Sequence, residues 1–369
     1  MNTYHTPWQA HRHIHAHRRY FDPWLLLLLL ALVSFGLIVL YSAGGPVLVK
    51  KQAIRLAMGF AVMLVLAQAR PERIAQFTPW FYGLTILLLV AVLLVGDTAK
   101  GARRWLYIGI RFQPSELAKL TVPLMVAWYL RLRPLPPGWQ DTTVALTLLL
   151  IPAGLVVVEP DLGTAILVAA AGFFALFLAG LSWKLLLALA TSLIAAAPVL
   201  WHFLHDYQKR RILTLLNPET DPLNAGWNII QSKIAIGSGG LLGKGWLQGS
   251  QTQLDFLPEH STDFILSVLA EEFGFAGVIT LLVIYLLILL RGFQIAIAAR
   301  DTFSRLVAGA LTLTFFVYLL INAGMISGVL PVVGIPLPLV SYGGTSIITL
   351  MAAFGMILSI HNHKKLIKQ

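Results

Sequence analysis

Long apolar runs dominate this sequence and restrict what it can fold into. Runs of about the length that crosses a bilayer as a helix lie near 24–44, 51–69, 76–96, 114–130, 143–158, 163–181, 184–201, 264–290, 305–325 and 344–360. Backbone groups find no water inside a bilayer, so such runs must form helices. We therefore expect an all-α, polytopic integral membrane protein with about ten transmembrane helices.

The composition excludes the other broad classes of protein. Hydrophobic residues make up 57% of the chain and charged residues 12%, whereas a soluble domain carries roughly 25% charged residues. A soluble enzyme and a disordered chain are therefore excluded. The sequence contains no cysteine, which excludes disulfides, thiol catalysis and thiolate metal sites.

The runs predict a single transmembrane domain over 24–361, with tails at 1–23 and 362–369. An even number of helices places both tails on one side, which basic residues such as Arg18 and Lys364 identify as cytoplasmic. The longest polar interruption, 202–263, is then expected as a large extracytoplasmic loop before helix eight. Its glycine-rich run, 237–249, has Gly245 after Lys244 where a phosphate-binding loop needs Ser or Thr, so it predicts a flexible or re-entrant loop.

Basic residues are in excess, with 27 Lys and Arg against 16 Asp and Glu. Such an excess suggests nucleic acid or an anionic lipid surface, and in a membrane chain its placement favours lipid, so no nucleic-acid partner is expected. Many of the basic residues fall on the outward side, which predicts that something anionic is held there. Metal binding by the N-terminal histidines is a hypothesis from composition alone; they are His5, His11, His13, His15 and His17.

The first outward loop leads into the apolar helix at 114–130, which Pro114 can open. Glu116 and Lys119 share one face of that helix, and ionisable residues inside an apolar span are costly unless they are paired or face a wet cavity. They predict either a structural ion pair or a polar cavity, and we favour the cavity. The loop supplies further candidates for its wall: Arg104, Trp105, Arg111 and Gln113.

Acidic residues converge on the same side of the membrane. Asp263 stands immediately before the apolar run of helix eight, where it is either a helix cap or a functional carboxylate. Glu159 and Asp161 follow the run at 143–158, at its outward end. Carboxylates among cations suit acid–base chemistry on an anionic substrate. The Pro- and Gly-rich segment 331–344 is expected as irregular backbone that lines this site, and Glu271, Glu272 and Asn322 as buried hydrogen-bonding partners.

Five motifs in order resemble the SEDS family (shape, elongation, division and sporulation), and the resemblance covers nearly the whole chain. The motifs are K-G-A-R-R-W at 100–105, F-Q-P-S-E at 112–116, E-P-D-L-G-T at 159–164, T-D-F at 262–264 and P-L-V-S-Y-G-G at 338–344. The run 331–338 and the short N-terminal tail are more similar to the elongation branch than to the division branch. Two positions depart from the pattern: Tyr107 replaces a frequently acidic residue, and Ser261 replaces a common histidine, with His260 beside it.

The resemblance implies a peptidoglycan glycosyltransferase that polymerises lipid II at the outer face of the cytoplasmic membrane during elongation and supports rod shape. Its implied partners are a class B penicillin-binding transpeptidase, other membrane proteins of the elongation complex, the growing glycan strand and membrane lipids. Asp263 is matched to the family's essential aspartate. The residues matched to the polar cavity are Arg104, Trp105, Arg111, Gln113, Glu116 and Lys119, and we add Glu159 and Asp161 as substrate-binding candidates.

These residue types allow a glycosyl transfer in a single displacement step. Asp263 takes the proton of the acceptor sugar's 4-hydroxyl, which attacks the donor's anomeric carbon and expels undecaprenyl pyrophosphate with inversion. Outward cations stabilise the leaving group. The residues identify no cofactor and no metal ligands, and a bound divalent cation is a further candidate to supplement the cations. Two alternatives stay open: a lipid II flippase, which needs cations along a path to the cytoplasmic face, and a non-catalytic scaffold, which has no need of Asp263.

Overall fold

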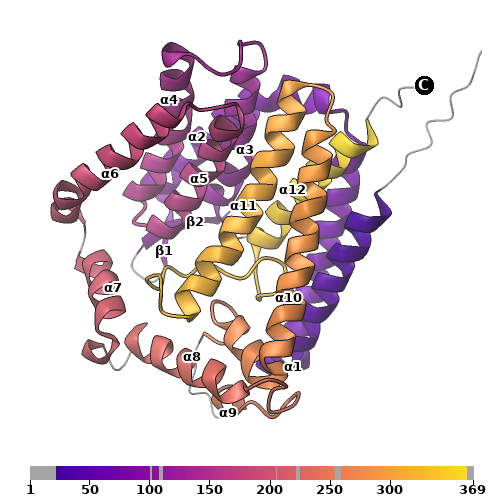
Figure 1. Ribbon diagram of the computed structural model, residues 1–369, viewed down its shortest axis with the longest axis vertical. Coiled ribbons are helices and arrows are strands. Elements are labelled where there is room, and N and C mark those ends of the chain that lie inside the picture. The colour runs from indigo at the N-terminus through magenta and orange to yellow at the C-terminus, as the bar shows by residue number, and fades with distance from the viewer. Residues whose placement is uncertain are drawn as a thin grey trace, which may run out of the picture.

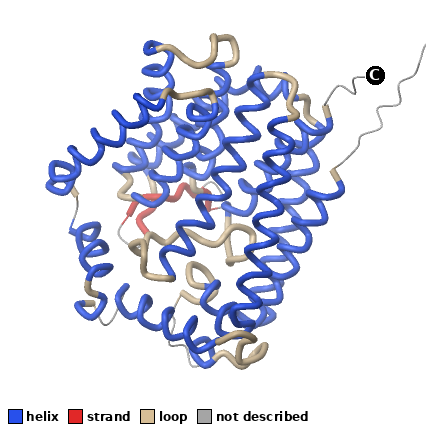
Figure 2. The backbone as a smooth tube through the Cα atoms, in the orientation of Figure 1, coloured by secondary structure: helices blue, strands red, loops and turns tan. Residues whose placement is uncertain are grey.

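The structure is a computed structural model that describes residues 22–99, 102–107, 111–204, 206–221, 225–253 and 259–363. The predicted histidine tail, residues 100–101 of the first motif and residues 364–369 lie outside these ranges. Helices make up most of the described chain, as the tube in Figure 2 shows, and the expected all-α fold is confirmed.

Twelve α-helices are described, joined by short turns, one 3₁₀ turn (Pro218–Thr220) and three short strands (Figure 1). The helices are α1 (Pro23–Gln68), α2 (Pro71–Val95), α3 (Pro114–Leu130), α4 (Trp139–Val158), α5 (Leu162–Leu178), α6 (Trp183–Phe203), α7 (Asp206–Leu216), α8 (Ala225–Gly239), α9 (Ser250–Gln253), α10 (Ile265–Ile297), α11 (Thr302–Ile326) and α12 (Thr345–Asn362). Prolines occupy the first position of α1, α2 and α3, where the missing N–H has no helical partner to lose.

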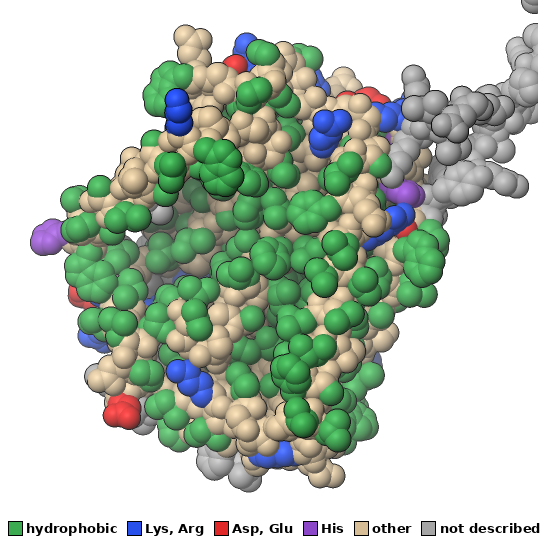
Figure 3. Space-filling view, in the orientation of Figure 1, with side chains coloured by type: hydrophobic (Ala, Val, Ile, Leu, Met, Phe, Trp, Pro, Cys, Tyr) green, Lys and Arg blue, Asp and Glu red, His purple; other side chains and the backbone are tan. Residues whose placement is uncertain are grey.

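Six of these helices are long and apolar enough to cross a membrane: α1, α2, α4, α10, α11 and α12. Hydrophobic side chains cover most of the face drawn in Figure 3, and charged side chains lie mainly toward its two ends. Such a band of exposed apolar side chains is what a bilayer covers.

The long helix α1 is a hairpin with its turn at Gly45. Its 46 residues would extend about 69 Å as one helix, yet both of its ends lie beside the end of α12. Asp22 stands 3.8 Å from the Nδ1 of His361, and Ser359 donates a hydrogen bond to the carbonyl of Ala69. The turn needs the left-handed φ of +66° at Gly45, which glycine adopts without a steric cost.

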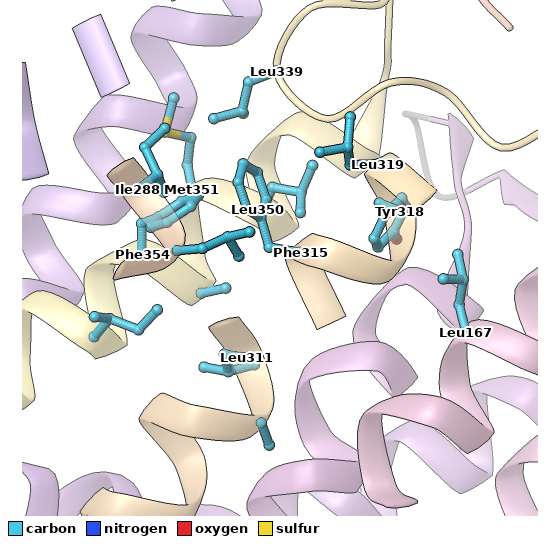
Figure 4. Close-up of a cluster of buried hydrophobic side chains, with 14 of the residues drawn as sticks. Leu167, Ile288, Leu311, Phe315, Tyr318, Leu319, Leu339, Leu350, Met351 and Phe354 are labelled. Carbon is cyan, nitrogen blue, oxygen red and sulfur yellow. The ribbon is translucent and has the colours of Figure 1, made fainter. Parts of the chain in front are cut away.

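A buried apolar cluster joins α11 and α12 to the helices around them (Figure 4). The rings of Phe315 and Phe354 meet edge to face at a centroid distance of 5.0 Å. Leu311 and Leu350 are buried beside them. The cluster leaves only a small space, of about 20 Å³, below the end of the molecule that carries the strands.

The three strands form a small antiparallel sheet in order, β1 (Asp97–Ala99), β2 (Ala102–Tyr107) and β3 (Arg111–Phe112). The sequence analysis expected only a loop here. Because the strands lie between α2 and α3, they hold this connection over the start of α3.

The segment 202–263, expected as one large loop, contains α7, α8 and α9. Its glycine-rich run is ordered turns rather than a loose loop. The amides of Lys244 and Gly245 donate to the carbonyls of Glu271 and Glu272, at the point where α10 breaks at Gly274 with φ +63°. The turns therefore fill the gap that the broken helix leaves.

Candidate functional site

A polar cavity of about 240 Å³ lies at the end of the bundle where α12 begins. It brings together segments that are distant in the sequence: the strand loop, α3, the start of α5, the turn before α10, α11 and the segment 334–346. Seven of the nine predicted site residues line it: Arg104, Trp105, Gln113, Glu116, Lys119, Asp161 and Asp263. The expected irregular segment also lines it, through residues such as Gly334 and Tyr342.

Asp263 lies in the turn of residues 259–264 that precedes α10. The N-cap of α10 is Phe264, which makes no side-chain capping hydrogen bond. Asp263 therefore stands one residue before the N-cap position, which was its structural alternative in the sequence analysis. Its Oδ2 approaches Gly334, where a Cβ would stand 3.3 Å away, so the glycine leaves room for the carboxylate.

The sequence left two interpretations open for Glu116 and Lys119, an ion pair and a polar cavity, and the structure contains both. Their side chains make an ion pair of 2.6 Å, with 8% and 6% of their side-chain surface exposed, and both line the cavity. Thr349 of α12 donates to the other carboxylate oxygen at 3.0 Å, and the Lys119 ammonium lies 5.0 Å from the ring centre of Tyr318. The pair is thus held from three helices.

Arg104 and Asp161 make the second charged contact of the cavity. The Nε of Arg104 lies 3.4 Å from Oδ2 of Asp161, and its Nη2 donates to the carbonyl of Pro160. Gln113 donates to the same carboxylate at 3.3 Å. Asp161 also caps α5 by accepting from the amide of Thr164, which fixes the carboxylate against the helix.

Two predicted site residues do not line the cavity. Arg111 is exposed on β3. Glu159 is 1% exposed in the connection between α4 and α5, and neither of its oxygens has a hydrogen-bond partner among the described residues. Burial, with a smaller contribution from the Asp161 charge, raises the pKa of Glu159 to about 8. Glu159 is therefore mostly neutral at pH 7, and its part in substrate binding stays a prediction.

The sequence analysis missed two residues of α1 that hold the cavity wall. Gln52 is buried, donates to the carbonyl of Ser341 at 2.9 Å and accepts from the amide of Gly343. Arg55 donates to the carbonyl of Gly343 at 3.0 Å and lies 4.5 Å from the ring centre of Tyr342. The one available signal in the sequence was their three-residue spacing in the polar stretch that follows the turn of α1 at Gly45.

Among the described residues, no three His, Asp or Glu side chains come close enough to hold a metal ion. The described chain does not provide the carboxylate and imidazole cluster expected of a protein-held divalent site. A divalent cation stays a prediction of the sequence and enters no step of the mechanism proposed for this site.

Comparison with known proteins gives consistent matches over nearly the whole chain. The family profile FTSW_RODA_SPOVE, described as "Cell cycle protein", matches residues 23–366. The peptidoglycan glycosyltransferase MrdB of Escherichia coli (strain K12) is 53% identical over 353 residues, 94% of this chain and 95% of the relative. The peptidoglycan glycosyltransferase MrdB of Helicobacter pylori (strain ATCC 700392 / 26695) is 39% identical, over 91% of this chain and 88% of that protein.

Solved structures share the fold. One chain from "Structural coordination of polymerization and crosslinking by a peptidoglycan synthase complex" superposes with a TM-score of 0.83 at 36% identity, covering 94% of this chain and 99% of that chain. The crystal structure of the rod shape determining protein RodA of Thermus thermophilus gives a TM-score of 0.72 at 33% identity, covering 93% and 97%.

Proposed function

The chain belongs to the FtsW, RodA and SpoVE family of cell cycle proteins, and from that premise we propose that it polymerises lipid II with Asp263 as its general base. The MrdB relatives carry peptidoglycan glycosyltransferase activity in their names, and this chain is a peptidoglycan glycosyltransferase as they are. Its apolar helices and its family make it a multi-pass inner-membrane protein.

The observation that carries the mechanism is the convergence of Asp263 with Arg104 and Lys119 in one cavity. A carboxylate is the group that can take a proton from a sugar hydroxyl, and it must stand within hydrogen-bond reach of that hydroxyl. The cations supply the charge that a pyrophosphate leaving group needs.

In the proposed step, Asp263 accepts the proton of the acceptor's 4-hydroxyl as the new bond to the donor's anomeric carbon forms. The bond from that carbon to the pyrophosphate oxygen breaks, and undecaprenyl pyrophosphate leaves with the electron pair. A single displacement inverts the anomeric centre. Both cations are already paired with carboxylates in the cavity, so the pyrophosphate must compete with Glu116 and Asp161 for them.

We infer a topology of ten transmembrane helices. They are the two arms of α1, counted separately, the five helices α2 to α6 and the three helices α10 to α12. The cavity lies at the first turn of α12 and Asp22 lies beside its last turn, which are about 27 Å apart along an 18-residue helix. That distance is close to the roughly 30 Å thickness of the hydrocarbon core. We place both termini in the cytoplasm and the cavity outward, with 202–263 as the large extracytoplasmic segment.

A class B penicillin-binding transpeptidase is the partner we propose, together with other membrane proteins of the elongation complex. The solved relative described as part of a peptidoglycan synthase complex that coordinates polymerization and crosslinking supports this choice. The growing glycan strand and membrane lipids complete the expected contacts.

The buried core argues for chemistry at the surface rather than transport. A lipid II flippase needs a polar path across the bilayer, yet apolar side chains close the interior below Lys119. Phe315, Leu350 and Phe354 lie in that region (Figure 4) and leave a space of only about 20 Å³, which is not a path across the bilayer. Charged side chains of the cavity thus stay at one end of the bundle.

The test is glycan-strand synthesis from purified lipid II by the purified full chain, with and without its transpeptidase. Asp263→Asn should lower the rate by about 10²–10⁴-fold, the range of general base catalysis, at unchanged thermal stability. Asp141→Asn is the matched control. Asp141 lies in the first turn of α4, at the end of that helix away from the cavity, and pairs with Arg133. A folded Asp263→Asn protein that keeps its activity would refute the assigned role, and lipid II transfer across vesicles without synthesis would favour the flippase.

A further inference from the structure

The turn that carries Asp263 is held by hydrogen bonds from outside its own helix. Three successive carbonyls accept them: Ser261 from the amide of Tyr342 at 2.9 Å, Thr262 from the hydroxyl of Ser341, and Asp263 from Nδ2 of Asn322 at 2.8 Å. α10 begins only at Ile265, so its own ladder does not fix this turn. The orientation of the aspartate depends on donors from α11 and from the segment 331–344.

Two of these donors also hold the wall of the cavity that faces the aspartate. Nδ2 of Asn322 makes a second hydrogen bond, to the carbonyl of Ile335, at 2.8 Å. The Oγ of Ser341 accepts from the amide of Leu337 at 2.8 Å. Asn322 is 0% exposed and Ser341 is 2% exposed, so neither bond is exchanged easily for one to water. Each side chain therefore joins the turn to the wall at one point.

The segment that presents Ser341 is itself held in a strained shape. Leu339 has a φ of +61°, a conformation that costs free energy for any residue with a Cβ and persists only where its surroundings impose it. Gln52 of α1 binds the backbone on both sides of Tyr342. The donors are thus fixed before any substrate arrives.

We propose that Asn322 and Ser341 are positioning residues, which set the distance and direction of the Asp263 carboxylate relative to the wall at residues 334–337. This inference rests on the proposed function, because it concerns the geometry of the general base. Neither residue touches the reacting atoms. They act through the backbone of Thr262 and Asp263, and a shift of about 1 Å in a reacting group can lower a rate by about 100-fold.

The competing account is that both side chains only stabilise the fold. A structural role lowers the amount or stability of folded protein and leaves each folded molecule as active as before. A positioning role lowers kcat in molecules that remain folded and leaves KM for lipid II nearly unchanged, because the residues that bind the substrate are not altered. The split between kcat and KM therefore separates the two accounts.

The experiment compares Asn322→Leu, which keeps the size of the side chain and removes both donors, with Thr312→Val on the same helix. Thr312 is a suitable control because it is buried and its hydroxyl donates only to the carbonyl of Ala308 in its own helix. We expect kcat of Asn322→Leu to fall by about 10- to 100-fold with KM within about twofold, and Thr312→Val to keep both. Ser341→Ala, which removes a single oxygen, provides a milder second variant if Asn322→Leu folds poorly, and its kcat should also fall.

Either of two results would overturn the proposal: wild-type kcat in folded Ser341→Ala and Asn322→Leu, or losses of activity that match the loss of folded protein. Measuring Asp263→Asn beside them separates this proposal from the one on which it rests. If Asp263→Asn is inactive and Asn322→Leu is fully active, the positioning role is refuted and the role of Asp263 as the base is not. An active Asp263→Asn refutes the assigned base, whatever the other variants do.

Discussion

Two lysine–glutamate pairs in this molecule share one contact distance and differ in everything around it. Lys119 and Glu116 stand 2.6 Å apart at the cavity, and Lys244 and Glu271 stand 2.6 Å apart where α10 breaks. At the cavity, the glutamate has one further side-chain donor, Thr349. At the break, the same Glu271 carboxylate also accepts from the amide and hydroxyl of Ser250 and from the amide of Gln251.

The difference teaches that the ion pair alone does not identify the functional site. Glu271 is fully buried and its oxygens are used by the first turn of α9, so its charge serves the connection between α9 and α10. Lys119 lines a cavity and can exchange its partner for a ligand. We therefore expect neutralising the first pair to remove activity, and neutralising the second pair to remove stability.

Among variants that separate the two pairs, the double variant Glu116→Gln with Lys119→Met has the largest expected effect. Glycan synthesis should fall by about 10²–10³-fold, because the cavity loses a preorganised cation for the leaving group. Folding should be retained, since replacing both members of a buried ion pair by neutral side chains is often close to neutral for stability. Initial rates with lipid II and thermal unfolding in the same detergent measure the two quantities.

The single variant Lys119→Met is the control for this prediction. It leaves Glu116 buried without its cation, which is more costly than removing the pair, so its melting temperature should lie below that of the double variant. A double variant that polymerises lipid II at the wild-type rate would remove the distinction between the two pairs.

The next effect is on stability, in the double variant Glu271→Gln with Lys244→Met. We expect the free energy of unfolding to fall by about 1.5–3 kcal/mol, because hydrogen bonds from Ser250 and Gln251 lose a charged acceptor. The rate per folded molecule should change little. Unfolding curves and the active fraction provide the measurement, and a large loss of rate in fully folded protein would contradict it.

The two pairs also show which kind of contact could be predicted from the sequence and which could not. Glu116 and Lys119 are three residues apart on one predicted helix, so local periodicity brings them together. Lys244 and Glu271 are separated by 27 positions, and their contact depends on a break at Gly274 and on glycine turns that pack into it. The sequence analysis expected a flexible or re-entrant loop there, because glycines permit turns without specifying which helix they meet.

The same limit applies to the rest of the fold and the site. Apolar runs identified the described apolar helices because a bilayer dictates their length and composition. The motifs contain six of the seven predicted residues that line the cavity, and helical spacing to Glu116 identified Lys119. Gln52 and Arg55 were missed because their role depends on contact with a segment almost 300 positions away. The sequence also could not show that Glu159 lies outside the cavity lining, because one turn decides whether a residue faces a cavity or the protein interior.

Glu159 gives the smallest expected effect and tests a third arrangement, a buried carboxyl without a lysine. Its pKa is raised to about 8 from an ordinary value of 4.5, mainly by burial, so the folded protein binds a proton that the unfolded chain releases. The stability that this proton supports is complete below about pH 4.5 and is lost as the pH rises through 8. Glu159→Gln stays neutral at every pH, so its melting temperature should exceed that of the wild type by an amount that grows from pH 5 to pH 9.

Glu72→Gln is the matched control, because Glu72 is exposed in the first turn of α2 and its replacement removes a carboxyl that is already in water. Melting temperatures of the three proteins across this pH range isolate the buried group. A difference between Glu159→Gln and wild type that stays constant from pH 5 to pH 9 would mean that Glu159 is charged in the folded protein. In that case a cation or a hydrogen-bond donor from the cavity must reach the Glu159 carboxylate. Arg104, which lowers the pKa of Glu159 by its charge, would be the residue to substitute next.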